Sequence, residues 1–268
     1  MAGCQPFHED DVAPFLELAR EAGWLCDRWE FEFLLATFPQ GCFVYRDAGA
    51  TLGYVTSIRY GRSGWIGNLL VRPEARRGGI GKQLMKRALS ALTRCGATTV
   101  WLTASEQGAG LYRRLGFVQI DHINRWSGKA AVNRSRESEP VRIDAIRAID
   151  RVGWGDRREA LLLASCGRGR LHTTSGGFLC HQQWSIGTQI GPWGCLLGPQ
   201  AGQLLDQVFS EGDETVFLDV PSGNFGAAAL LIERNFTVTG STLLMYYGET
   251  PLYQPGNIYA LASMGSMG

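Results

Sequence analysis

The segment LVRPEARRGGIGKQL, residues 70–84, constrains the fold more than any other part of the sequence. It begins inside the apolar run GWIGNLLV, which predicts a strand that ends before Pro73, because proline cannot donate to a strand ladder. Apolar residues then recur with helical spacing from residue 80 to residue 92. The sequence therefore predicts a strand, a glycine-rich turn and a helix in immediate succession.

This turn has the properties of an anion-binding site. The first N–H groups of a helix have no partner within the helix and carry a partial positive charge. Glycine fills three of the four positions 78–81 and lets a bulky phosphate approach the backbone, while Arg76, Arg77 and Lys82 add charge. The net charge of the chain is only +1, so we expect a local pyrophosphate site and no general attraction to nucleic acid or membrane.

Two common phosphate-binding motifs do not fit this segment. A P-loop needs a serine or threonine after its lysine, but Lys82 is followed by Gln83, so the hydroxyl that binds Mg²⁺ is missing. A dinucleotide-binding GxGxxG fingerprint needs a third glycine, and Leu84 stands in its place. Both motifs are therefore excluded.

A third motif fits. Residues 76–81 match the pattern [Q/R]-x-x-G-x-[G/A], and the segment resembles the acetyl-CoA pyrophosphate loop of the GNAT superfamily of N-acetyltransferases. GLYRRLGF, residues 110–117, is similar to the LYxxLGF segment that follows in that family. The resemblance implies an α/β fold and the following acetyl-CoA-binding residues: Leu69, Leu70, Val71, Arg76, Arg77, Gly78, Gly79, Ile80, Gly81, Lys82 and Ser105.

The resemblance also implies a mechanism, in which a neutral amine attacks the thioester directly. Main-chain groups of residues 69–71 are expected to hold the pantetheine arm and the thioester oxygen. Tyr112 aligns with the tyrosine that protonates or hydrogen-bonds the leaving sulfur in many members. Asn68 stands where several members carry a glutamate, and an amide orients water but does not accept a proton. We therefore expect Tyr112 and Asn68 to be catalytic residues, with the general base unassigned.

Acidic and aromatic residues near the N-terminus are candidates for the acceptor side. By analogy with the family, Asp27, Glu30 and Glu32 lie on substrate-side helices, where they would attract a cationic amine. Trp24 and Trp29 would wall the acceptor pocket. The alternatives are solvated helix charges and ordinary core packing.

The chain divides into two halves of similar length. The polar stretch SGKAAVNRSRESEP predicts a linker, which gives a catalytic domain at 1–127, a linker at 128–140 and a second domain at 141–268. AGWLCDRWEFEFLLATFPQGCFV, WIGNLLVRPEARRGGIG, LTASEQGAGLYRRLGF, GDRREALL and IGPW together resemble bacterial tandem-GNAT proteins. We therefore expect two GNAT-like domains, each a mixed, mostly antiparallel sheet flanked by helices. The second has no arginine in its counterpart of the loop, so it is expected to lack its own acetyl-CoA site.

Patterning places the other elements. In the first half we expect helices at DDVAPFLELAREAG, WEFEFLLATF and GAGLYRRLG, a hairpin around residues 47–49, and strands at TTVWLTA and FVQIDHINRW. In the second half we expect helices at VRIDAIRAIDRVG, DRREALLLAS, AGQLLDQVFS and FGAAALLIERNF, with strands at GGFLCHQQW, GTQIGPWGCLL, TVFLDVP and VTGSTLLMYYG.

Several other classes of protein are not expected. Seven cysteines without CxxC spacing indicate reduced thiols in a cytoplasmic protein, and four dispersed histidines indicate no metal site. We see no signal peptide and no apolar run long enough to span a bilayer. The expected function is acetyl-CoA-dependent N-acetylation of a primary amine on a small-molecule or amino-acid-like acceptor, with a homodimer left open. The alternatives are a non-catalytic acyl-CoA-binding sensor and an acyltransferase for another acyl group.

Overall fold

The computed structural model describes residues 2–133 and 143–268. The first half contains these elements in order: β1 (Gly3–Pro6), α1 (Val12–Glu21), α2 (Arg28–Thr37), β2 (Phe43–Asp47), β3 (Ala50–Arg59), β4 (Ser63–Val71), α3 (Ile80–Arg94), β5 (Thr99–Ala104), α4 (Glu106–Arg114) and β6 (Val118–Val132). The second half contains these: α5 (Ile143–Trp154), α6 (Glu159–Arg168), β7 (Arg170–Thr174), β8 (Gly177–Trp184), β9 (Gly187–Cys195), α7 (Gly198–Val208), β10 (Phe209–Pro221), α8 (Phe225–Ile232), β11 (Thr237–Gly248) and β12 (Ile258–Ala260).

Every helix and strand expected from patterning is present, and the differences lie at edges and ends. The strands β1, β7 and β12 are short and were not predicted. Strand β6 extends to Val132, so residues 128–132, expected to be linker, are part of the sheet. Ala130 and Val132 are buried whereas Lys129 is exposed, which is the alternation of a half-buried strand, and this stretch pairs with β10. Asn133 follows the strand, and residues 134–140 of the expected linker lie outside the described residues.

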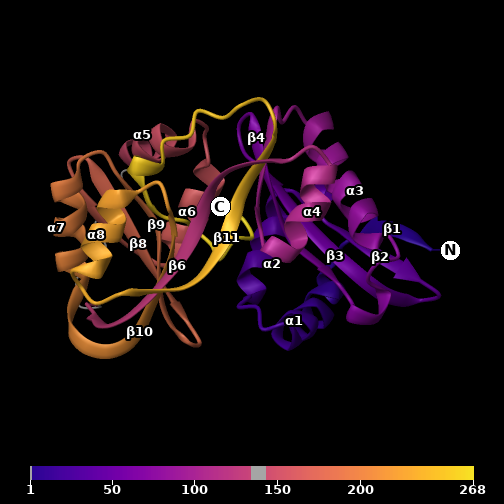
Figure 1. The fold of residues 1–268 in the computed structure, drawn as a ribbon, viewed down its shortest axis with the longest axis horizontal. Coiled ribbons are helices and arrows are strands. Elements are labelled where there is room, and N and C mark those ends of the chain that lie inside the picture. The colour runs from indigo at the N-terminus through magenta and orange to yellow at the C-terminus, as the bar shows by residue number, and fades with distance from the viewer. Residues whose placement is uncertain (1, 134–142) are drawn as a thin grey trace.

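The two halves share one continuous sheet rather than forming two separate sheets. Its strand order is β1-β2-β3-β4-β5-β11-β6-β10-β9-β8-β7, with β12 paired to β9. Strand β11, from the second half, lies between β5 and β6, while β6, from the first half, pairs with β10. Figure 1 shows β6 and β11 crossing the middle of the molecule between the two groups of helices. Each half thus contributes one strand that pairs with a strand of the other half within the common sheet.

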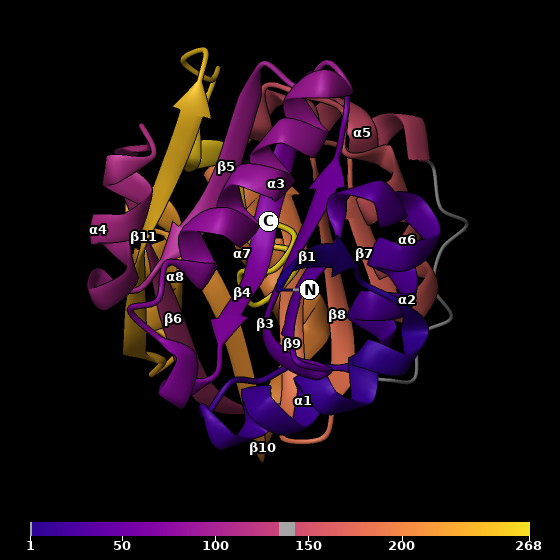
Figure 2. The same cartoon turned by 90° about the vertical axis from the view of Figure 1, so that its right-hand side faces the viewer.

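Helices cover both faces of the sheet in each half. In the first half, the buried face of α3 packs with β4 and β5 in one apolar cluster, whereas α1 and α2 pack in another cluster on the opposite face. Figure 2 shows this half in front of the second, with α3 and α4 on one side and α1 and α2 on the other. The cluster on the α1 and α2 face continues into the second half through Trp154 and Leu161. The core therefore spans both halves.

Candidate active site

Strand β4 separates from β5 along half of its length. The two strands pair in parallel only between residues 63–65 and 99–101, although β4 continues to Val71 and β5 to Ala104. The main chain of β4 beyond Trp65 is therefore not hydrogen-bonded to β5. Such a split leaves backbone donors and acceptors for an extended ligand to bind.

A β-bulge lies at the opening of this split. Tyr54 of β3 is opposite Leu70 and Thr56 is opposite Gly67, so β4 has one extra residue in this interval. Asn68 occupies the bulge with φ of 54°, a left-handed conformation that asparagine tolerates better than most residues. Its Nδ2 donates to Thr56 Oγ1 at 3.1 Å, and the side chain is buried. The amide that we expected to be catalytic thus fixes the bulge.

The glycine-rich turn lies at the end of β4, as predicted. Gly79, with φ of 80°, is the N-cap of α3, and no side chain caps this helix end. Arg77 also has a left-handed φ, of 68°, while Arg76 Nε donates to the carbonyl oxygen of Val71 at 3.1 Å. Residues 76–79 and Lys82 are exposed. Within residues 2–133 and 143–268, none of these three cations forms an ion pair with an acidic side chain.

Gly81 lies where the glycine-rich turn, the split between β4 and β5, and helix α4 come together. A Cβ atom on Gly81 would lie 3.5 Å from Leu111 of α4 and 3.8 and 3.9 Å from the side chains of Val71 and Leu69 of β4. The expected binding residues of β4, the turn and α3 are therefore brought together. Ser105 lies at the start of α4, where its Oγ accepts from the N–H of Gly108 at 3.2 Å.

Tyr112 is on the same helix as Leu111, close to this meeting point. Its ring packs edge-on against Phe117, with the ring centroids 6.0 Å apart. Burial raises the pKa of Tyr112 to about 12, so the phenol stays protonated at neutral pH. The hydroxyl is therefore able to act as a hydrogen-bond donor at neutral pH.

The structure separates the three acidic residues expected on the acceptor side. Glu32 is exposed and contributes to a groove of about 430 Å³ with Phe7, His8 and Leu35. Glu30 is only 1 % exposed and accepts a hydrogen bond from Ser266 Oγ. Glu30 is therefore the buried carboxylate of this helix.

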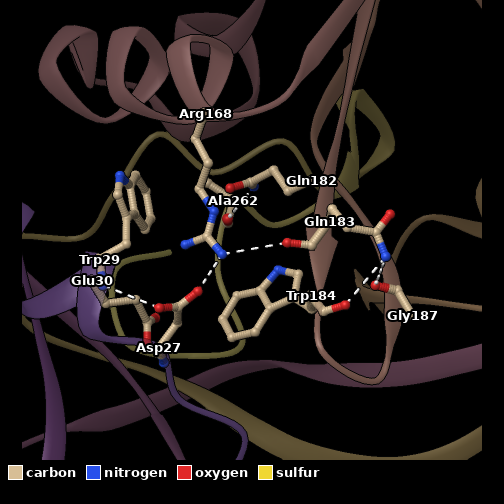
Figure 3. A network of polar contacts seen from close by, with 9 residues as sticks. All are labelled: Asp27, Trp29, Glu30, Arg168, Gln182, Gln183, Trp184, Gly187 and Ala262. Carbon is tan, nitrogen blue, oxygen red and sulfur yellow. Dashed lines mark hydrogen bonds and ion pairs between the residues drawn. The ribbon is translucent and has the colours of Figure 1, made fainter. Parts of the chain in front are cut away.

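Asp27 and Trp29 belong to a contact between the halves. Asp27 forms an ion pair with Arg168 at the end of α6, and Arg168 also donates to the carbonyl oxygen of Gln183 at 3.4 Å. The guanidinium carbon lies 4.8 Å from the ring centroid of Trp29 and 5.0 Å from that of Trp184. Figure 3 shows the guanidinium between the two indole rings. Trp24, by contrast, is 42 % exposed and is outside this contact.

Sequence reasoning missed Arg168 and Ser266. Both are supplied by the second half, far along the chain from α2, and no local pattern marks either of them. Arg168 follows LASCG, which has the pattern of an ordinary helix end, and Ser266 lies among the small residues of SMGSMG. Neither context indicates a function.

The second half has a corresponding split that its own chain fills. Strand β9 pairs in parallel with β10 at only Thr188 and Gln189. Beyond that point β12 pairs with β9, and the N–H of Leu261 donates to the carbonyl oxygen of Asp219 in β10 at 2.9 Å. Backbone groups that the first half leaves free are thus used internally here. The absence of arginine in the counterpart loop is consistent with this.

Comparisons with known proteins identify the family. Two models, each described as an acetyltransferase (GNAT) domain, match residues 39–119 and 146–260, which together are more than half of the chain. The chain therefore belongs to the GNAT acetyltransferases and carries two such domains in tandem.

Individual relatives extend over the whole chain. The uncharacterized N-acetyltransferase YitH of Bacillus subtilis (strain 168) is 24 % identical over 96 % of this chain and 95 % of its own. A crystal structure of a protein from Pyrococcus horikoshii has a TM-score of 0.85 at 22 % identity, covering 100 % of this chain and 96 % of that one. A GCN5-related N-acetyltransferase from Sphaerobacter thermophilus has a TM-score of 0.64 at 16 % identity, covering 97 % and 98 %. Both structures share the tandem fold.

Two kinds of feature are absent from the described residues. Among them, no helix is both long and apolar enough to cross a membrane. Within the same residues, no three side chains of His, Cys, Asp or Glu are grouped as metal ligands would be.

Proposed function

We propose that the first half binds acetyl-CoA in the split between β4 and β5 and transfers its acetyl group to the primary amine of a small-molecule or amino-acid-like acceptor. The observation that carries this proposal is the position of the uncapped α3 N-terminus at the end of the split strand. A pyrophosphate at residues 76–82 would direct the pantetheine arm along the unpaired edge of residues 69–71.

The chemistry needs a polarised carbonyl, a stabilised leaving sulfur and close placement of the two reactants. Main-chain N–H groups of β4 beyond the bulge would donate to the thioester oxygen, and Asn68 would hold them in place. Tyr112, protonated at neutral pH, would donate to the departing thiolate. The acceptor would approach from the opposite face, where α2, α6 and the last residues of the chain meet.

In this proposal the second half binds no acetyl-CoA. The filling of its split by β12 supports that assignment, as does the missing arginine. Its role would be to complete the sheet and to supply part of the acceptor side, including Arg168.

Thiol release from acetyl-CoA, followed with a panel of amines, tests the proposal. The panel would contain amino acids, a diamine, an aminosugar and a peptide with a free N-terminus. We expect turnover with at least one class, and calorimetry should show one acetyl-CoA site per chain. Tight acetyl-CoA binding without turnover of any amine would contradict the enzyme assignment.

That outcome would favour the second candidate, a non-catalytic acyl-CoA-binding protein. One observation supports it: the acceptor face of the split is covered by residues 261–268, of which Leu261, Ala262, Ser263, Ser266 and Met267 are each at most 5 % exposed. Substituting propionyl-CoA or succinyl-CoA in the same assay would test the remaining alternative, a different acyl group.

A further inference from the structure

The chain segment after β12, residues 261–268, crosses the acceptor face of the split. Trp65 of β4 donates through Nε1 to the carbonyl oxygen of Gly265 at 2.9 Å, and Thr103 of β5 donates to the same oxygen at 3.3 Å. Trp65 is the last residue of β4 that pairs with β5. The segment is therefore fixed to both strands at the point where they part.

The next residue, Ser266, connects this point to α2. A Cβ atom on Gly67 would lie 2.3 Å from the carbonyl oxygen of Ser266, so the two backbones are in direct contact one residue before the bulge. The hydroxyl of Ser266 donates to Glu30 Oε1. Ser266 thus lies between the opening of the split and a buried carboxylate.

Glu30 is held in this position from its own helix. It is the third residue of α2, and its Oε2 accepts from the N–H of Asp27 at 3.5 Å in a capping box. The side chain of Glu30 is 1 % exposed. One oxygen of Glu30 is thereby used for the helix cap, and the other is directed to Ser266.

We infer that Glu30 is the general base of the reaction and that Ser266 relays the proton to it from the acceptor amine. This inference rests on the proposed acetyl transfer. Glu30 would take the role of general base, which Asn68 cannot take because an amide does not accept a proton.

The proton and electron pairs balance without another reactant. The amine nitrogen forms a bond to the thioester carbonyl carbon, and its proton passes to Ser266 Oγ while the Ser266 hydroxyl proton passes to Glu30 Oε1. The carbon–sulfur bond then breaks, and the thiolate leaves with the hydrogen bond of Tyr112. Protonated Glu30 returns its proton to solvent or to the thiolate before the next turnover.

The other acidic residues of this region are unsuited to the task. Asp27 is paired with Arg168, and Glu32 is exposed near Arg28. The groups that face Glu30 are Cys26, Asp27 and Arg168, together with the Ser266 hydroxyl.

The electrostatics around Glu30 agree with the assignment. Burial raises the pKa of Glu30 to about 7, an effect that the hydrogen bonds from Ser266 and Asp27 only partly offset. A base is most effective when its pKa is near the working pH.

The test replaces Glu30 by glutamine, which keeps the size and the hydrogen-bonding capacity of the side chain. We expect Glu30→Gln to lower kcat by about 100-fold and to leave the KM for acetyl-CoA within about twofold of the unaltered protein. Glu17→Gln, an exposed change on the neighbouring α1, is the matched control and should leave both constants unchanged. Ser266→Ala should lower kcat by about tenfold, and Ser266→Thr should restore part of the loss.

The pH profile distinguishes proton acceptance from a structural effect. With methoxyamine as the probe acceptor, whose nitrogen is uncharged over the range scanned, kcat/KM should rise with pH through a midpoint near the pKa of Glu30. Glu30→Gln should remove this limb, and Glu30→Asp should retain it at a lower rate. Thermal melting of each variant distinguishes a loss of proton acceptance from a loss of the fold.

Two outcomes would overturn the inference in different ways. Full activity and an unchanged pH limb in Glu30→Gln would exclude Glu30 as the base and leave the acetyltransferase proposal intact. No turnover by the unaltered protein with methoxyamine or any amine of the panel would overturn both.

Discussion

Gly67 and Ser266 are in direct backbone contact, although one is in β4 and the other is near the end of the sequence. A Cβ atom on Gly67 would lie 2.3 Å from the Ser266 carbonyl oxygen and 2.7 Å from its Cα. No real Cβ contact is that short, and the opposing atoms are main chain, so they cannot rotate away. The position of the segment 261–268 against β4 therefore depends on a residue without a side chain.

Gly67→Ala is expected to displace this segment. The free energy of unfolding should fall by about 1–3 kcal/mol, the usual result of overpacking a buried contact. Chemical denaturation measures it. Gly167→Ala, in α6 with nothing within 4 Å of the added carbon, is the control and should stabilise the protein slightly, because alanine favours a helix. Equal stability of the two variants would contradict the contact.

The part of the site that is local in sequence was predictable. The strand, the glycine turn and α3 follow one another within residues 63–94, so the spacing of apolar residues, proline and glycine is enough to place them. Tyr112 follows from the next strand and helix in the same manner. One strand carries residues 69–71, and the turn with the start of the next helix carries residues 76–82. Each of these elements can be placed from its own local pattern.

The rest of the site could not be predicted because it depends on contacts between distant segments. Nothing in the pattern of β6 or β11 says that each would pair across the halves, since alternation fixes which face a residue takes but not which strand lies beside it. Glu30 has the sequence context of an ordinary capping box. Only Ser266 and the burial that the second half provides distinguish it from Glu32.

Positive charge at the turn should govern affinity for acetyl-CoA. Arg77→Ala removes a cation that has no acidic partner among the described residues. Alanine carries a Cβ atom as arginine does, so the left-handed φ of 68° at this position should be kept. We expect the Kd of acetyl-CoA to rise by about tenfold at low salt, the effect of losing one charge-assisted hydrogen bond. The difference should shrink at high salt, because the site is exposed.

Calorimetry at two salt concentrations measures this change. Arg94→Ala, at the other end of α3, is the matched control and should bind acetyl-CoA as the unaltered protein does. An equal loss of affinity in both variants would show that general charge, rather than the turn, attracts the ligand.

Tyr112→Phe should affect catalysis rather than binding. The phenyl ring keeps the packing against Phe117, so we expect the Kd of acetyl-CoA to stay within about twofold, while kcat falls on the order of 100-fold. Because the pKa of Tyr112 is raised to about 12, its proton is retained through the alkaline range accessible to the assay. A Tyr112-dependent loss of kcat with a midpoint below pH 10 would contradict this environment.

The contact between Asp27 and Arg168 should stabilise the arrangement of the two halves. Arg168→Lys keeps the charge but loses the planar group that lies between Trp29 and Trp184, so we expect a loss of about 1–2 kcal/mol in the free energy of unfolding. Asp206→Asn breaks an ion pair with Arg234 in which the Asp206 side chain is 67 % exposed, and it should cost about 0–1 kcal/mol. If Arg168→Lys lowers the free energy of unfolding no more than Asp206→Asn does, the contact of the guanidinium with the two indole rings contributes nothing to stability.

Burial of Glu30 should make stability depend on pH in a direction opposite to that of most carboxylates. Its pKa is raised from 4.5 in the unfolded chain to about 7 in the fold, so the folded state binds the proton more tightly. This stabilisation is fully present below pH 4.5 and is lost as the pH rises to about 7, with a total on the order of 3 kcal/mol. Glu30→Gln carries no titrating group, so it should become more stable relative to the unaltered protein between pH 5 and pH 8. Denaturant midpoints across this range measure the difference, and a constant difference between the two proteins would show that Glu30 is already charged at pH 5.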